Sequence, residues 1–154
     1  PNMVTTAGVH QNPHIRTAIS SKRAMLYKAY YSSYTMARAL LLASRIGGKA
    51  FKREDTAVWR EQGTIWAGHG SCYLLTPKFF ELLGTLDVHS FLYFEEAFLA
   101  HQVERAGEKI WYEPTLEIEH ACNSTIGSLP GRGTWGYSRD AYRTYRDLTR
   151  ADAK

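Results

Sequence analysis

The chain has 154 residues, of which 44% are hydrophobic and 22% are charged, and these proportions exclude a disordered chain and favour one globular domain with a real core. Its longest apolar stretch, residues 37–43, contains Arg38 and is far shorter than the roughly 20 residues of a membrane span, so a membrane-spanning helix is excluded as well. The formal net charge of +4 suits an anionic partner, but so small an excess does not distinguish a nucleotide diphosphate from a lipid-linked phosphate, an anionic membrane face or a nucleic acid.

The chain begins at Pro1 and shows no charged leader followed by an apolar core. We therefore expect no secretory signal, and we interpret the chain as processed or as a piece of a longer protein. The two cysteines, Cys72 and Cys122, lack the spacing of a metal or redox motif, and two cysteines are too few for a disulfide framework. A cytoplasmic location is therefore expected.

The N-terminal part predicts one strand and one long helix. Residues 3–7 are β-prone, and residues 8–13 have the composition of a loop. Residues 21–46 lack helix breakers and are rich in Ala, Leu, Met, Lys and Arg, which predicts a single helix ended by Gly47 and Gly48. Four tyrosines of this segment recur at spacings of three and four, so they share a helix face that serves either packing or substrate binding. They are Tyr27, Tyr30, Tyr31 and Tyr34.

Short strands are predicted in the middle of the chain. Residues 57–60 and 64–67 are candidate strands separated by Gly63, and residues 71–75 are the stronger candidate.

Two further helices are predicted. Thr76 followed by Pro77 is typical of an N-cap with proline at the first helical position, which predicts a short helix over residues 78–83. The glycine- and proline-rich residues 125–136 predict turns, and the helical pattern returns from Tyr137.

Two adjacent carboxylates, Glu95 and Glu96, follow an aromatic-rich run and stand in the first turn of a helix predicted to end at Gly107. A carboxylate can take the proton from an attacking hydroxyl group if its pKa suits that task. The helix N-terminus favours the charged form and the neighbouring carboxylate disfavours it, so the sequence leaves the balance open. The alternative is structural, because two glutamates in a first helical turn are favourable partners of the helix dipole.

Two short strands, residues 109–112 and 116–119, follow that helix and deliver His120 at the end of the second strand. Alternation places His120 on the same face as Ile118, with the two flanking glutamates on the other face. The carboxylate pair and the histidine are thereby predicted to converge on one site. A structural histidine at a strand end is the alternative.

The segment resembles the acceptor-side half of bacterial family 2 glycosyltransferases, inverting enzymes of the GT-A fold that use nucleotide sugars. The family has an aromatic run ending in Glu-Asp at the start of a helix, a small pair at its end, a strand with proline, and a histidine followed by a serine. The matching residues are 91–96, Ala106, Gly107, Pro114, His120 and Ser124. The resemblance covers residues 66–124. It implies an α/β fold, the C-terminal half of a GT-A domain with a few mixed strands flanked by helices over residues 1–124, followed by a turn-rich segment and a basic helix over residues 125–154.

The resemblance also implies a role for each matching residue. Glu96 occupies the position of the family's base and Glu95 supports it, although Glu stands here where the family has Asp, and Phe98 replaces a further acidic residue. His120 is expected near the donor diphosphate and its divalent metal, Mg²⁺ or Mn²⁺, as a ligand or as a cation, with Ser124 as its companion. The family approaches its acceptor at four further positions, which packing alone would also explain. They are Trp66, Gly68, His69 and Gly70.

The Asp-x-Asp motif, with which the family binds metal and nucleotide, is absent, since no two aspartates stand two apart. The resemblance therefore implies a fragment that carries the acceptor side and is not expected to catalyse alone. The complete enzyme is expected to move a sugar from a nucleotide-sugar donor to a saccharide or lipid-linked acceptor in cell-envelope polysaccharide synthesis. A noncatalytic carbohydrate-binding or interaction module is the first alternative, and a basic nucleic-acid-binding domain is the less favoured one.

The C-terminal helix interleaves tyrosines with four arginines. They are Arg139, Arg143, Arg146 and Arg150. Such a helix suits the anionic inner face of a membrane, on which the protein would then lie peripherally, and it also suits single-stranded nucleic acid. The plainer interpretation is a solvated helix in which Asp140 and Asp147 pair with neighbouring arginines.

Overall fold

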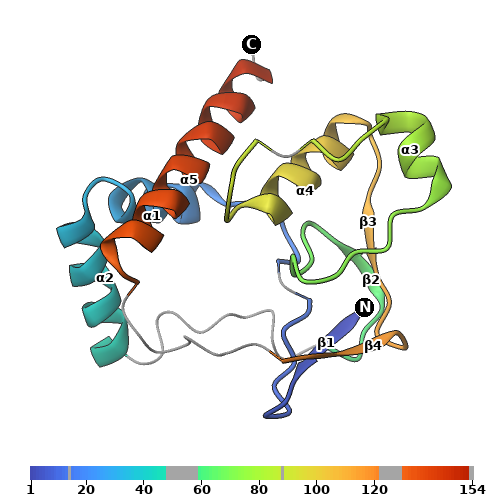
Figure 1. Cartoon of the computed structure of the whole chain (residues 1–154), viewed down its shortest axis with the longest axis horizontal. Coiled ribbons are helices and arrows are strands. Elements are labelled where there is room, and N and C mark those ends of the chain that lie inside the picture. The colour runs from blue at the N-terminus through green and yellow to red at the C-terminus, as the bar shows by residue number, and fades with distance from the viewer. Residues whose placement is uncertain (14, 48–58, 88, 122–129, 153–154) are drawn as a thin grey trace.

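The computed structural model describes the chain except for residues 14, 48–58, 88, 122–129 and 153–154. Its elements are β1 (Asn2–Thr5), α1 (Ser21–Tyr30), α2 (Tyr34–Gly47), β2 (Gly63–Ile65), α3 (Pro77–Leu83), α4 (Glu95–Arg105), β3 (Ile110–Tyr112), β4 (Glu117–His120) and α5 (Arg132–Asp152). The strands lie on one side, α1, α2 and α5 gather on the other, and α4 lies between them (Figure 1). The fold is mixed α/β with short strands, as the sequence predicts.

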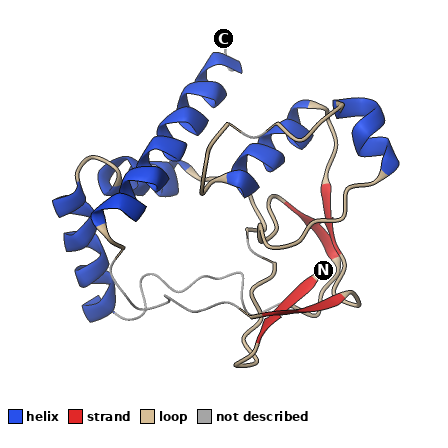
Figure 2. Ribbon diagram, in the orientation of Figure 1, coloured by secondary structure: helices blue, strands red, loops and turns tan. Residues whose placement is uncertain are grey.

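The described strands form two separate two-stranded sheets (Figure 2). β1 and β4 come from distant parts of the chain and pair in parallel, with Thr5 opposite His120. β2 and β3 pair antiparallel, with Gly63 opposite Tyr112. The strands that follow α4 in sequence therefore belong to different sheets. In β4 the alternation is as expected, because Ile118 and His120 are partly buried while the two glutamates are exposed.

One of the predicted strands is wrong, and a second lies partly outside the described residues. Residues 71–75 pair with none of the described strands and run as an irregular segment, in which the Tyr73 hydroxyl donates to the carbonyl oxygen of Gly68 at 3.0 Å. β-prone residues do not make a strand unless a neighbour offers a ladder. The predicted strand over residues 57–60 lies partly outside the described residues, and Trp59 and Arg60 form a turn.

The single helix predicted over residues 21–46 is also wrong, because the chain turns between α1 and α2. Ser32 donates its hydroxyl proton to the carbonyl oxygen of Ala29 at 2.7 Å, and the hydroxyl of Ser33 accepts the N–H of Met36 at 3.2 Å. Serine side chains compete for backbone groups in this way, which favours helix ends over helix interiors. Two consecutive serines therefore end one helix and begin the next.

The tyrosine face of α1 packs against α5 and α4. Tyr31 stacks on Tyr142 with ring centroids 4.7 Å apart, and its hydroxyl lies 2.7 Å from that of Ser138. The ring of Phe94 lies 6.0 Å from those of Tyr27 and Tyr31. These contacts favour packing over a substrate platform, and burial raises the pKa of Tyr31 above its ordinary value.

The helices around the strands follow local sequence signals. Thr76 caps α3 as predicted, since its hydroxyl accepts the N–H of Phe79 at 3.3 Å, and Gly84 ends the helix with φ of 73°. α4 buries one face, including Phe98 and Leu99. α5 begins five residues before the predicted start at Tyr137, so the turn-rich segment is shorter than expected. Among the described residues, no helix is both long and apolar enough for a bilayer.

Candidate active site

The first turn of α4 follows a strained turn. Tyr93 and Phe94 both have left-handed backbone, with φ of 70° and 65°, a conformation that is uncommon outside glycine and often marks a functional site. Glu95 Oε1 accepts the N–H of Tyr93 at 2.9 Å, and the Ser90 hydroxyl donates to the carbonyl oxygen of Tyr93 at 2.8 Å. The carboxylate of Glu95 therefore secures the turn from which Glu96 projects.

Glu96 faces the loop formed by His69, Gly70 and Ser71. The N–H of Gly70 donates to Glu96 Oε1 at 3.0 Å. A Cβ atom on residue 70 would lie 2.6 Å from that oxygen and 3.1 Å from Glu96 Cδ, so any side chain there would displace the carboxylate. The structure thus brings together Gly70 and Glu96, two residues predicted for the site, and the N–H of Gly70 holds the carboxylate.

The two neighbours of Gly70 connect the same loop to His120. Ser71 donates its N–H to His69 Nδ1 at 3.3 Å, and its hydroxyl lies 2.7 Å from the same nitrogen. That hydroxyl also lies 3.2 Å from His120 Nε2, and the two histidine rings meet edge to face with centroids 5.4 Å apart. On its other side, His120 Nδ1 donates to Gln11 Oε1 at 2.7 Å. One three-residue loop therefore contacts both the carboxylate of α4 and the histidine of β4.

The hydrogen-bond roles in this chain of groups are constrained. His69 Nδ1 accepts from the backbone, so it also accepts the single hydroxyl proton of Ser71. The oxygen of Ser71 is then an acceptor toward His120, whose Nδ1 already donates to Gln11. The Ser71 oxygen lies 3.2 Å from His120 Nε2 and 3.5 Å from Nδ1, so it faces the ring edge between the two nitrogens.

The buried side-chain amide of Asn12 holds the loop of residues 69–71 in place. Asn12 is 2% exposed, its Oδ1 accepts the N–H of His69 at 2.9 Å, and its Nδ2 donates to the carbonyl oxygen of Pro1 at 2.9 Å. Its polar atoms are thus satisfied, as buried groups require. Sequence reasoning missed Asn12, Gln11 and Ser71. Their positions in loops carry no periodic signal, although Ser71 stands directly beside a predicted site residue.

The other predicted acceptor residues lie apart from this cluster. Trp66 donates its indole N–H to Glu104 Oε2 at 3.5 Å, eight residues beyond Glu96 and therefore about 12 Å further along α4. Gly68 contacts Tyr73, since a Cβ atom there would lie 3.2 Å from that ring. Burial, and then the charges of the carboxylate pair, raise the pKa of Tyr73. Ser124 lies outside the described residues.

The described residues do not fit a complete metal site. His120 and His69 offer imidazole nitrogens, but nowhere in the described part of the chain do three or more His, Cys, Asp or Glu side chains gather as a metal site. The metal implied by the resemblance would therefore need ligands from elsewhere.

The arginines of α5 are partly engaged. Arg139 pairs with Asp140 at 2.9 Å, and Arg146 pairs with Asp147 at 2.7 Å, as the solvated-helix interpretation expects. The guanidinium of Arg139 also lies 5.1 Å from the centre of the Trp135 ring. Such exposed pairs contribute little to stability.

Comparison with known proteins identifies no relative: no protein-family profile, no curated protein and no solved structure matches the chain.

Proposed function

We propose that this chain supplies the acceptor-side catalytic element of an inverting GT-A glycosyltransferase, with Glu96 as the base. One observation carries the proposal: Glu96 and His120, which the resemblance assigns to the acceptor and the donor diphosphate, both contact the loop of residues 69–71. The acceptor hydroxyl would attack the anomeric carbon from the face opposite the departing diphosphate while Glu96 takes its proton.

The surrounding groups support this division of tasks. The Gly70 N–H fixes the direction of the Glu96 carboxylate, and a charge-assisted hydrogen bond of this kind gives the orientation that proton transfer needs. The resemblance implies that His120 lies near the donor diphosphate, where a cationic ring would offset the negative charge that develops as the diphosphate departs. Glu95 acts on the turn before α4 and so positions Glu96.

The wider setting belongs to the same proposal. A nucleotide-sugar donor and its Mg²⁺ or Mn²⁺ would be held by an Asp-x-Asp segment, which this chain lacks. The acceptor would be a saccharide or a lipid-linked saccharide of the cell envelope. We place the reaction in the cytoplasm, with the arginines of α5 as a contact to the inner membrane face.

The test is Glu96→Gln in the complete natural protein, assayed by nucleoside diphosphate release from a panel of UDP-, GDP- and dTDP-sugars with Mg²⁺ or Mn²⁺. We expect release to fall by about a hundredfold or more, because general-base catalysis contributes on that scale. Glu81→Gln is the matched control, since Glu81 is an exposed helical carboxylate on α3. Circular dichroism should show both variants folded.

Two results would count against the proposal. Unchanged release by Glu96→Gln would remove Glu96 as the base. No release by the unaltered protein with any donor, together with saturable saccharide binding, would favour the noncatalytic carbohydrate-binding module.

A further inference from the structure

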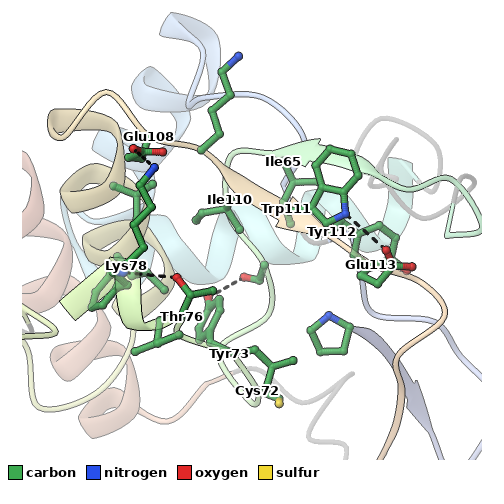
Figure 3. A pocket seen from close by; sticks show the side chains of 18 of the residues that line it. Ile65, Cys72, Tyr73, Thr76, Lys78, Glu108, Ile110, Trp111, Tyr112 and Glu113 are labelled. Carbon is green, nitrogen blue, oxygen red and sulfur yellow. Dashed lines mark hydrogen bonds and ion pairs between the residues drawn. The ribbon is translucent and has the colours of Figure 1, made fainter. Parts of the chain in front are cut away.

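A cavity of about 350 Å³ is lined in part by Tyr73, two residues beyond Ser71 of the candidate active site (Figure 3). Its walls come from α3, α4 and the β2–β3 sheet, and they are mainly hydrocarbon. The wall residues include Ile65, Phe79, Leu82, Leu99, Val103 and Ile110. The volume falls within the range of roughly 300–1,000 Å³ that is common for small-molecule sites.

Several polar side chains on the lining already have protein partners. The Tyr73 hydroxyl donates to Gly68, and the Thr76 hydroxyl accepts the N–H of Phe79. Lys78 on α3 forms an ion pair of 2.7 Å with Glu108, so these two opposite charges cancel at the edge of the cavity, as Figure 3 shows. A ligand that brings its own unpaired polar groups inside would lose their hydration without compensation. The lining therefore selects hydrocarbon over a peptide segment, whose backbone needs hydrogen-bond partners.

The apolar lining continues to the surface. Leu74 and Trp111 both line the cavity, yet they are 69% and 57% exposed. Leu116, another lining residue, is also exposed. Exposed apolar side chains that border an apolar cavity provide a continuous path from solvent to its interior, and patches of this kind mark binding sites. A chain-shaped ligand could thus enter lengthwise and leave its polar end in water.

We propose that this cavity binds a single linear alkyl chain of an amphiphile with an uncharged polar head. The proposal goes beyond the glycosyltransferase assignment and does not depend on it, because Glu96, His69 and His120 are not among the lining residues. Gly68 and Tyr73 connect the two sites. Both line the cavity, and the charge of Glu96 contributes, after burial, to the raised pKa of Tyr73.

The test uses octyl, nonyl and decyl maltoside below their critical micelle concentrations, titrated into the complete natural protein by calorimetry. We expect the dissociation constant to fall about fourfold for each added methylene, which is the transfer free energy of one buried methylene expressed as an affinity ratio. Maltose, which has no alkyl chain, is titrated as the control for binding through the sugar head alone. Affinity that does not change with chain length would overturn the proposal.

Variants at the mouth locate the site. Leu74→Asp places a charge at the entrance and should weaken decyl maltoside binding at least about tenfold. Leu86→Asp is the matched control, because Leu86 is an exposed loop leucine outside the lining, and it should bind as the unaltered protein does. Equal affinity of the two variants would refute the assignment. So would a dimer that dissociates in Leu74→Asp, since a second copy would then be the occupant. Loss of transferase activity without loss of alkyl binding would concern only the proposed function.

Discussion

Replacing Gly70 by alanine tests the candidate site through one added methyl group. The Cβ atom would lie 2.6 Å from Glu96 Oε1, whereas ordinary contacts begin at 3.4 Å, so the carboxylate oxygen must withdraw by roughly 0.8 Å. That movement lengthens the 3.0 Å hydrogen bond from the Gly70 N–H. The backbone of Gly70 need not change, because no positive φ requires glycine there.

The effects on stability and on activity should differ in size. The displaced atoms are the end of a flexible side chain in an exposed contact, so unfolding should become easier by only about 1 kcal/mol, the usual scale of one hydrogen bond. Catalysis depends on position far more steeply, and a misplacement of about 1 Å can reduce a rate about a hundredfold. We therefore expect a large loss of nucleoside diphosphate release in a protein that remains folded.

The assay compares Gly70→Ala with Gly136→Ala in the complete natural protein. A Cβ atom on Gly136 meets nothing within 4 Å, and alanine is the better helix former by about 0.5–1 kcal/mol, so this control should be slightly stabilised and fully active. Denaturant unfolding gives the stability of each variant, and nucleoside diphosphate release gives its activity. Equal activity of the two variants would refute the role assigned to the contact between Gly70 and Glu96.

Three further predictions follow from single contacts. Glu95→Gln keeps an oxygen that accepts the Tyr93 N–H and should retain release within about twofold, whereas Glu95→Ala should lose about tenfold; equal losses would show that the charge of Glu95 is needed. Thr76→Ala removes the cap of α3 and should lower the free energy of unfolding by about 1 kcal/mol, measured by urea denaturation, and an unchanged midpoint would contradict the cap. Burial, followed by the charge of Glu104, raises the pKa of Tyr145 to about 12, so its contribution to stability is present below pH 10 and lost as the pH rises through 12. The decline in unfolding free energy over that range should be smaller in Tyr145→Phe, and an identical decline would show that Tyr145 titrates normally.

Local signals in the sequence predicted the elements that local interactions stabilise. Thr76 and Pro77 begin α3, and Gly84 ends it with the left-handed backbone that glycine permits. The bounds of α4 follow in the same way from its acidic first turn and from Gly107. In each case the residues that determine the end of a helix lie within one turn of it.

Local capping signals do not predict which distant segments pair as strands. No local pattern shows that β4 pairs with β1, or that residues 71–75 pair with no strand in the described part of the chain. The division of the predicted long helix had a local cause, because Ser32 and Ser33 both bond the backbone. The good helix formers on either side hide this helix-ending tendency in the sequence.

The choice between the two carboxylates shows why a site can be located from sequence while its chemistry cannot. Consecutive residues on a helix point about 100° apart, so Glu95 and Glu96 cannot both face the same loop. The sequence places both carboxylates at the start of α4, and the backbone around them determines the contact that each one makes. Glu95 accepts the N–H of Tyr93 in the left-handed turn, and Glu96 approaches the backbone of Gly70, which has no side chain. A glycine predicted to accommodate an acceptor sugar is thus better explained by the carboxylate that it admits. Any sugar that approaches Glu96 must then do so from a side other than the Gly70 backbone.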